Sequence, residues 1–465
     1  MPKLVWRVKL VSERGSGVTT ETEVARIERD EEAGLAELGL RLAEAKRLTA
    51  ALQAQIVPAQ VAVAGECRRR YEACGRRLAS KGHYRARFRS LFGDVPVRVR
   101  RLLVCSCQDV GEAKSGAALD LGEGAVAPEL AYVTARYAAL APFGKVAALL
   151  SELLPVSGTQ HASTVRNRTL RVGTGIVRGH AAETSSRPTA RTAGPVVVGL
   201  DGGHVRGRHR GEGRHFEVIA GKIIDAHGTQ HRFAFVRDGQ AAATAAVRQA
   251  LAAAGVSADT PATVLCDGDP GLWRLQRAVL PAATTVLDWW HAAVRFEHAL
   301  QAARGLGANM ADADLAHQVT RGLKRTKWRL WHGRWPGCRR KLAALRRWIG
   351  RETLREVAGM DGVRRRVADL LGYLERNEAA LVHYVARRRR GEPISTAFVE
   401  SAVNEIVAKR MTKKQQMRWG RTTVQPFLDV RTAVLNGTLE GAFRHRYPGF
   451  RPANDDRRPA AAAAA

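Results

Sequence analysis

Glycine, proline and polar clusters divide the second half of the chain into short apolar runs. Residues 195–201 read Pro-Val-Val-Val-Gly-Leu-Asp, and this β-branched run is typical of a strand buried on both faces. The runs that follow it predict two antiparallel strands, a helix, a strand, a second helix and a last strand. These elements are expected at residues 215–224, 232–236, 241–254, 262–266, 272–279 and 284–287. The predicted order is therefore β-β-β-α-β-α-β.

Two of these strands end in an aspartate that is followed by glycine. Asp201 ends the first strand, and Asp267 ends the strand at 262–266. The order of elements is the plan of a ribonuclease H-like fold, in which the first and fourth strands are neighbours. Both carboxylates would then lie within reach of one cation. An ordinary Asp-Gly turn also explains Asp201, and Asp269 is an alternative second acid, although the strand-end position favours Asp267.

Strand signals stop from residue 292 to residue 391, where the sequence predicts a basic helical domain inserted into the fold. Arg and Trp residues are interleaved there, and such side chains can stack on bases and bind phosphates. The candidate DNA-binding residues of this insertion are Lys324, Arg325, Lys327 and Trp328. The alternative is that the Trp side chains pack inward while the basic face is only solvated.

A helix predicted over 395–411 resumes the fold after the insertion. At spacings of three and seven residues, Glu400 shares a face with the apolar Val403 and Val407, which are expected to face the sheet. Together with the two strand-end aspartates, Glu400 predicts a third metal ligand; alone, it is explained by an ion pair. The basic residues that follow are candidate phosphate contacts or a solvated face: Arg410, Lys413, Lys414 and Arg418.

The N-terminal segment is locally acidic, unlike the rest of the chain. Residues 3–12 alternate enough to predict a strand, and residues 21–55 carry apolar positions at helical spacing. Because the heptad pattern is irregular, we expect this long helix to pack on its own chain. A coiled coil with a second copy is the alternative.

Four cysteines flank a basic β-hairpin that is predicted to turn at Gly93 and Asp94. Cys67 and Cys74 precede the hairpin, and Cys105 and Cys107 follow it. Four thiolates around a small hairpin are typical of a structural zinc site. The spacings differ from the usual C-x2-C pairs, so four free thiols are the alternative.

Residues 128–173 predict three short helices joined by tight turns, at 128–140, 142–154 and 159–170. The third helix carries the candidate DNA-binding residues Arg166, Asn167, Arg168 and Arg171. This arrangement favours a helix-turn-helix whose last helix enters the major groove. A three-helix unit with a solvated basic face is the alternative.

The chain has 465 residues, and its 75 Lys and Arg outnumber 44 Asp and Glu to give a formal net charge of +31. Such an excess is expected of a protein that binds double-stranded DNA. We find no apolar run near 18 residues and no signal-peptide pattern, and therefore expect no membrane partner and a cytoplasmic, nucleoid-associated protein. The six cysteines are too few for a disulfide scaffold.

Together these signals predict an α/β protein with a ribonuclease H-like mixed-sheet core and an α-helical insertion. The expected parts are an N-terminal strand and long helix (1–60), a Cys-containing β-hairpin module (61–115), a helix-turn-helix-like DNA-binding domain (116–180), a linker (181–194), the core (195–291 and 392–445), the insertion (292–391) and a disordered tail (446–465).

Several strings of residues resemble bacterial insertion-sequence transposases of the DDE type, specifically the ISKra type. They are Val-Glu400-Ser-Ala-Val-Asn, Arg410-Met411, Gln416-Met417-Arg418-Trp419, Leu-Asp201-Gly-Gly-His-Val-Arg and Cys-Asp267-Gly. The string Asp288-Trp-Trp-His291 is similar to the Asp-x-x-His element that Mutator-like transposases carry ahead of a helical insertion. The cysteine hairpin also resembles the N-terminal module of the family, whose Cys pairs are more ribbon-like.

The resemblance extends over about residues 195 to 440 and implies DNA cleavage at insertion-sequence ends and strand transfer into target DNA. Asp201, Asp267 and Glu400 would hold two Mg²⁺ (or Mn²⁺) ions, because oxygen-only ligands favour these metals. His291 would act as an auxiliary group near the scissile phosphate. Two transposon ends must be brought together, which implies a homo-oligomer. A DNA-binding regulator with an inactive core and a stand-alone nuclease are the alternative functions.

Overall fold

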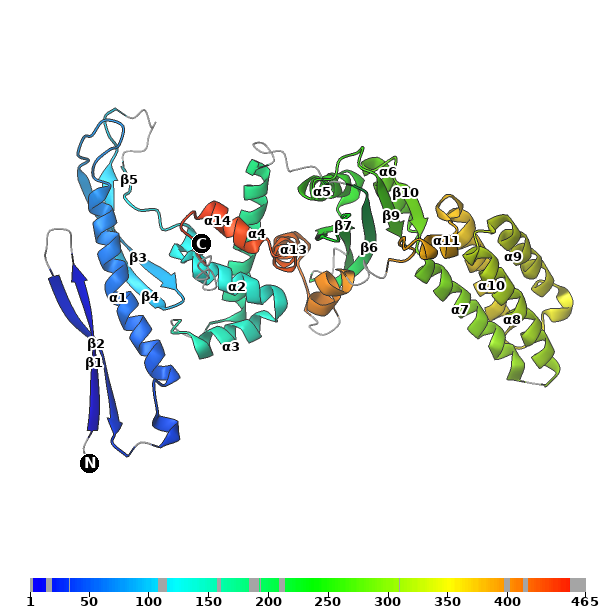
Figure 1. Cartoon of the computed structure of the whole chain (residues 1–465), viewed down its shortest axis with the longest axis horizontal. Coiled ribbons are helices and arrows are strands. Elements are labelled where there is room, and N and C mark those ends of the chain that lie inside the picture. The colour runs from blue at the N-terminus through cyan, green and yellow to red at the C-terminus, as the bar shows by residue number, and fades with distance from the viewer. Residues whose placement is uncertain are drawn as a thin grey trace, which may run out of the picture. The chain divides into compact units, whose positions relative to one another are not determined.

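The computed structural model divides the chain into two compact units (Figure 1), Met1–Gly179 with Thr438–Ala465, and His180–Gly437. The residues that it describes are 3–13, 19–32, 34–107, 115–156, 160–183, 192, 194–208, 214–308, 310–396, 402–412 and 417–451. The chain is a mixed α/β protein, as predicted, with one mixed sheet in the second unit.

The first unit begins with a two-stranded antiparallel ribbon, β1 (Lys3–Glu13) and β2 (Thr19–Asp30). The prediction of a helix from residue 21 was wrong for this segment. Acidic residues of β2 lie opposite basic residues of β1, and Lys3–Glu28 and Arg7–Glu23 form ion pairs across the ribbon. Such cross-strand pairs stabilise the extended conformation.

Helix α1 (Leu42–Cys67) starts later than predicted and continues past residue 55. Its buried side packs against a three-stranded sheet formed by β3 (Ser80–Ser90), β4 (Gly93–Leu103) and β5 (Ser115–Ala117). The predicted hairpin is present, but its turn lies at Leu91 and Phe92, just before the predicted position. Gly93 has φ +110° and begins β4, and Asp94 already pairs with Arg89. The small core between helix and sheet consists of Val57, Val61, Val95, Val97 and Val99.

The three predicted helices of the first unit are present as α2 (Pro128–Leu140), α3 (Phe143–Leu153) and α4 (Ala162–Glu183). Helix α4 runs further than expected, into the segment predicted as a linker. The last helix, α14 (Leu439–Arg446), also belongs to this unit. Its Phe443 packs edge-on against Tyr132 of α2, with ring centroids 5.3 Å apart.

The second unit is built on a five-stranded sheet with the strand order β10-β9-β6-β7-β8. Its strands are β6 (Val196–Arg206), β7 (His215–Ile224), β8 (Gln230–Val236), β9 (Ala262–Cys266) and β10 (Thr284–Leu287). The first and fourth of these strands, β6 and β9, lie side by side, as the sequence predicted, and they pair in parallel. The predicted end of β6 at Asp201 was wrong, because its pairing with β7 continues to Arg206. Strands β6, β7 and β8 are antiparallel, whereas β9 and β10 are parallel to β6.

Two layers of helix cover this sheet. Helices α5 (Gly239–Ala253) and α6 (Pro270–Val279) pack on one face, over a core that includes Val196, Val198 and Leu200 of β6. The segment Asn404–Thr412, a π-helix, packs on the opposite face beside helix α13 (Arg421–Leu435).

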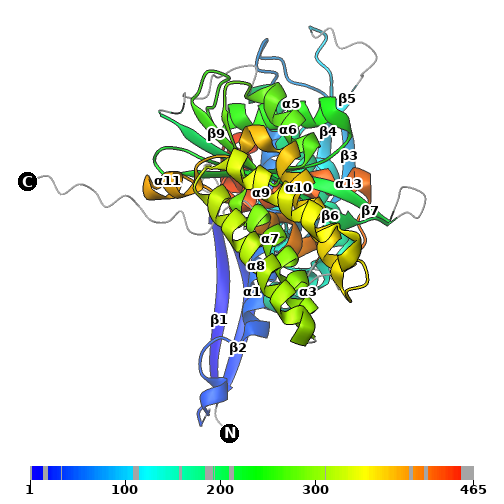
Figure 2. The ribbon, with the colours of Figure 1, turned by 90° about the vertical axis from the view of Figure 1, so that its right-hand side faces the viewer.

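The predicted helical insertion is present between β10 and the π-helix. Its main helices are α7 (Trp289–Arg304), α8 (Met310–Trp331), α9 (Trp335–Ile349), α10 (Met360–Arg376) and α11 (Tyr384–Arg389). Figure 2 shows α7 to α10 running side by side as a bundle. The bundle shares one apolar core with Leu265, Val286 and Leu287 at the ends of β9 and β10. The insertion is therefore continuous with the part of the sheet that carries the acids.

Candidate functional site

Three aspartates follow one another across the carboxyl edge of the sheet. The parallel pairing of β6 with β9 matches Gly199 to Leu265, so two residues further Asp201 comes opposite Asp267. The pairing of β9 with β10 matches Cys266 to Leu287, so Asp288 is next in the row. Neighbouring strands lie about 4.8 Å apart. The backbone thus places three acids in register at one edge.

The π-helix segment packs directly beside Asp201. Asp201 and Gly203 project to the same face of β6, since side chains alternate along a strand. A Cβ atom added to Gly203 would lie 3.4 Å from Val403 and 3.5 Å from Val407. These are ordinary contact distances, so the segment packs directly on this face of β6. Glu400, Lys413 and Lys414 lie outside the residues that the structure describes.

The two acids of the Asp267-Gly-Asp269 string have different surroundings. Asp269 caps helix α6, because its Oδ1 accepts hydrogen bonds from the backbone N–H groups of Gly271 (2.8 Å) and Leu272 (3.0 Å). Asp267 accepts one backbone hydrogen bond through Oδ1, from Asp269, at 2.9 Å. A capping carboxylate is already committed to a helix end, which favours Asp267 as the metal ligand.

Asp288 and His291 form a hydrogen-bonded pair next to this row. The carboxyl group of Asp288 is fully buried and caps helix α7, and its Oδ2 lies 2.6 Å from Nδ1 of His291. The hydroxyl of Thr396 donates to the same Oδ2. Burial alone would raise the pKa of Asp288, but the hydrogen bonds from His291 and Thr396 hold it below its ordinary value.

The charges of the acid row act on His291. Burial tends to lower the pKa of this imidazole, whereas the hydrogen bond to Asp288 and the charges of Asp288, Asp267 and Asp201 together raise it above its ordinary value. The side chain of His291 is 28% exposed, so the imidazole is partly accessible to solvent. It can therefore hold a proton, or a positive charge, close to the row of acids.

The charges of the acid row also act on Cys266. Its thiol is fully buried at the end of β9, and its pKa is raised well above the ordinary value, first by burial. The charges of Asp267, Asp201 and Asp288 raise it further. Negative charges gathered in this way are stable when a cation or a proton compensates them.

Two buried tyrosines of the insertion hold the strand ends, and sequence reasoning missed both. The hydroxyl of Tyr373 in α10 donates to the carbonyl oxygen of Asp267 at 2.8 Å. The hydroxyl of Tyr384 in α11 donates to the carbonyl oxygen of Leu287, just before Asp288, at 2.9 Å. Both lie about a hundred positions after the acids, so no local sequence signal could have identified them.

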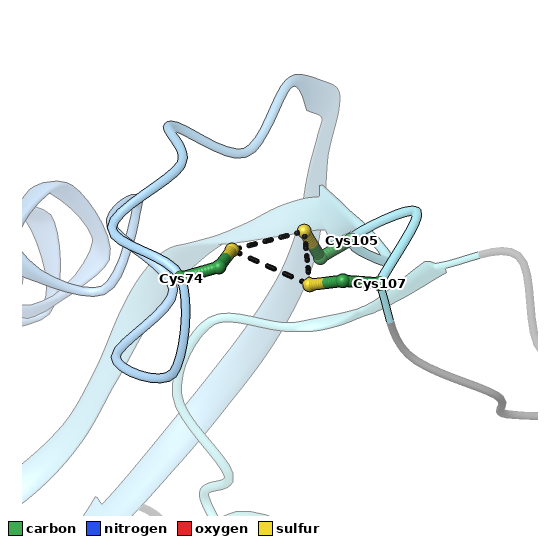
Figure 3. A group of neighbouring side chains, drawn as sticks. All are labelled: Cys74, Cys105 and Cys107. Carbon is green, nitrogen blue, oxygen red and sulfur yellow. Dashed lines mark hydrogen bonds between the residues drawn. The ribbon is translucent and has the colours of Figure 1, made fainter.

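Three of the four predicted zinc-binding cysteines come together in the first unit (Figure 3). The sulfur atoms of Cys74, Cys105 and Cys107 lie 3.1 to 3.5 Å apart. Cys67, at the end of α1, is exposed and is not part of this group. Tyr71 stands three residues before Cys74, where a C-x2-C pair would have its first cysteine.

The chemistry of the three thiols fits a metal such as zinc. Hydrogen bonds from the backbone and the thiol of Cys107 lower the pKa of Cys105 to about 7. A thiol with a lowered pKa is readily deprotonated, and the thiolate is the form that binds metal. Sulfur ligands of tetrahedral zinc lie about 3.8 Å apart, close to the separations seen here.

In the predicted recognition helix α4, only some of the four candidate DNA-binding side chains are accessible to solvent. Asn167 and Arg171 are exposed, and Arg166 is half-buried with its guanidinium 3.1 Å from the side chain of Asn167. The prediction that Arg168 contacts DNA was wrong. Its side chain is 7% exposed and donates a hydrogen bond to the hydroxyl of Thr134 at 3.1 Å. Its charge is used to join α4 to α2, not to contact DNA.

The insertion exposes a basic face that includes the aromatic side chain of Trp328. Lys324 and Arg325 are exposed on α8, and Trp328 is 51% exposed. Lys327 is partly buried and pairs with Glu297 at 2.8 Å. Trp335 is buried, so the inward-packing alternative holds for this tryptophan.

The prediction that Arg410 contacts DNA was also wrong. It was a candidate phosphate contact, but it is fully buried, with its guanidinium carbon 5.0 Å from the ring centre of Phe427 and 5.7 Å from that of Trp419. Burial lowers the pKa of Arg410 to about 10. Arg418, next to Trp419, is exposed and remains a candidate.

No protein-family model matches the chain, and no curated protein matches it.

Proposed function

We propose that this chain is a DDE-type DNA transposase with a ribonuclease H-like catalytic core. It would cut DNA at the ends of an insertion sequence and transfer those ends into target DNA. The observation that carries the proposal is the register of β6 with β9, which aligns Asp201 with Asp267 at the carboxyl edge of the sheet. The packing of Val403 and Val407 on Gly203 supports Glu400 as the third acid, because it brings the segment that follows Glu400 to the same edge.

The proposed metal ligands are Asp201, Asp267 and Glu400, and the metal is Mg²⁺ or Mn²⁺. Clustered carboxylates without thiol or imidazole ligands suit these hard cations. When two ions are bound at such a site, they activate the attacking oxygen and stabilise the leaving oxygen of a phosphoryl transfer. The fit rests on the acid row and on its effect on the pKa values of Cys266 and His291.

The other residues of the site have positioning roles in this proposal. Asp288 fixes the orientation of His291 through the 2.6 Å contact at Nδ1, which leaves the other ring nitrogen for a phosphate or a leaving oxygen. Tyr373 and Tyr384 hold the backbone at the two strand ends. Thr396 fixes the second oxygen of Asp288 from the segment ahead of Glu400.

Basic, polar and aromatic side chains that are at least partly exposed supply the DNA contacts in this proposal. Candidates are Arg166, Asn167 and Arg171 on α4, Lys324, Arg325 and Trp328 on α8, and Arg418. With a net charge of +31, binding should release many counterions. We therefore expect the affinity for duplex DNA to fall steeply as the salt concentration rises.

The experiment is a cleavage and joining assay on duplexes from the DNA that flanks the coding sequence on both sides. D201N, D267N and E400Q should each abolish cleavage in Mg²⁺ while retaining DNA binding. D259N, which changes an exposed aspartate of the same unit, is the matched control. D269N should remain active, because asparagine also caps helices.

Each outcome separates the proposed function from its alternatives. Specific DNA binding without cleavage in Mg²⁺ or Mn²⁺ would indicate a regulator with an inactive core. Cleavage without joined products would indicate a stand-alone nuclease. Cleavage that continues in excess chelator would refute the metal-dependent site.

A further inference from the structure

Helix α1 carries an apolar stripe on the side that faces away from β4. Ile56 is 39% exposed and Val63 is 48% exposed, and Ala59 between them is exposed as well. The opposite side of the helix, with Val57 and Val61, is buried against the sheet. The stripe also includes the half-buried Leu48 and Leu52 and the exposed Cys67, so it consists of Leu48, Leu52, Ile56, Ala59, Val63 and Cys67.

The segment that contains this helix is unusually apolar for its exposure. Leu35–Cys67 is long and apolar enough to span a membrane by length and composition alone, with a mean hydropathy of 1.2 over 18 residues, so the expectation that no apolar run approaches 18 residues was wrong. Only 17% of that window is buried within the chain. Residues 48–65 contain no charged side chain. An apolar surface of this kind marks an interaction site.

The spacing of the stripe is symmetric. Successive members are four, four, three, four and four residues apart, so the sequence of spacings reads the same in both directions. When a second α1 lies antiparallel, Ile56 faces Ala59 of the other copy, Leu52 faces Val63, and Leu48 faces Cys67. Each pair sets a larger side chain against a smaller one, as close helix packing requires. The stripe is therefore complementary to itself, which is the requirement of a two-fold interface.

Charge also favours a second copy over nucleic acid. Residues 1–67 contain nine Lys and Arg and ten Asp and Glu, a net charge of −1. Subtracting this −1 from the total of +31 leaves +32 on the remainder of the chain. A phosphate backbone would bind the basic remainder, whereas two copies can approach each other through the neutral segment without strong repulsion.

We propose that α1 is the surface through which two copies of this chain associate, packed antiparallel about a two-fold axis near residues 57 and 58. The contact uses the stripe Leu48 to Cys67, and the buried side of the helix stays on its own sheet. This interface gives the expected homo-oligomer a defined surface. It does not depend on the proposed catalytic function, because it can be tested in the absence of DNA.

A disulfide cross-link tests the pairing directly. In the L48C variant the introduced thiol is 19 residues from the native Cys67, or about 28 Å along one helix, far beyond disulfide reach. Any disulfide between these two thiols must therefore join two copies. We expect a covalent dimer after mild oxidation of the full-length protein at high salt, with the linkage mapped by peptide mass spectrometry. The same variant with C67S added should give no such linkage.

Charge substitution tests the energetics of the interface. I56D combined with V63D should turn a dimer into a monomer by light scattering, with at least a 100-fold rise in the dissociation constant. L149D, at a leucine on α3 that is 42% exposed, is the matched control and should remain dimeric. Circular dichroism should show the same fold for all three proteins, because every substituted position is exposed.

Three results would overturn the proposal. The first is a parent chain that is monomeric at all concentrations, and the second is a dimer that I56D with V63D leaves intact. The third is a monomer that binds neutral phosphatidylcholine vesicles through the stripe and loses this binding in the double variant. That last result would assign the surface to a membrane.

Discussion

Replacing Tyr373 by phenylalanine isolates one hydrogen bond at the candidate site. The residue is 3% exposed, and its ring lies under the guanidinium of Arg295, 4.0 Å from the ring centre. Y373F keeps this packing and removes only the hydroxyl that donates to Asp267 at 2.8 Å. The carbonyl group of Asp267 then loses a buried donor, which costs about 1–3 kcal/mol of the free energy of unfolding.

Loss of this hydrogen bond should also slow DNA cleavage, because Asp267 is a proposed metal ligand. If about 1.4 kcal/mol of the loss falls on the productive geometry of the site, the cleavage rate falls about tenfold. Y373F should also raise the Mg²⁺ concentration needed for half-maximal cleavage. Y384F removes the equivalent bond at Leu287 and should lower stability by a similar amount without this change in metal dependence.

The measurements are thermal unfolding and cleavage over a series of Mg²⁺ concentrations, at a temperature where both variants are folded. Y84F, at a tyrosine that is 37% exposed, is the control and should resemble the parent in both assays. The reasoning is refuted if Y373F matches the parent in stability and metal dependence. An equal effect of Y384F on metal dependence would show that the effect is not specific to Asp267.

Three further predictions concern other parts of the chain. C105S should lose the roughly one zinc per chain that we expect in the purified protein, whereas C67S should retain it, and metal analysis checks both. Burial raises the pKa of Asp429 to about 7, so its deprotonation destabilises the fold as the pH rises from about 4 to about 7. D429N should therefore be more stable than the parent by about 1–3 kcal/mol at pH 8, with little difference at pH 4, and equal unfolding temperatures at pH 8 would contradict this. G221A should lower the free energy of unfolding by about 1–3 kcal/mol, since an added Cβ would lie 2.2 Å from the ring of Phe233, while G144A, where nothing lies within 4 Å, should not.

The acid row could be predicted because its signals are local. Each strand contains a short apolar run, and Asp201 and Asp267 directly follow these runs, so the order of elements alone placed Asp201 beside Asp267, although β6 itself continues past Asp201 to Arg206. The ribbon strand β2 was missed for a local reason as well. Its apolar residues Val24 and Ile27 are three positions apart, which is helical spacing, but the ion pairs with β1 favour the extended conformation.

Burial of charged residues could not be predicted from the sequence. Arg168 and Arg410 look like DNA contacts because they are cations in basic segments. Arg168 finds a hydroxyl partner in Thr134, and Arg410 finds two aromatic rings, and these partners lie far away in the sequence or on another element. The two tyrosines at the strand ends were missed for the same reason, since their partners are backbone carbonyls about a hundred residues away.

The last helix, α14, has a consequence for how the chain is assembled during synthesis. Phe443 and Phe450 complete the aromatic cluster around Tyr132, so the N-terminal unit depends on residues that are synthesised after the whole of segment 180–437. Segment 180–437 can reach its native state while this cluster is still incomplete. A nascent chain should therefore complete the folding of residues 180–437 before that of residues 1–179. A stop codon shortly after residue 437 should release a protein in which the first 179 residues are incompletely folded.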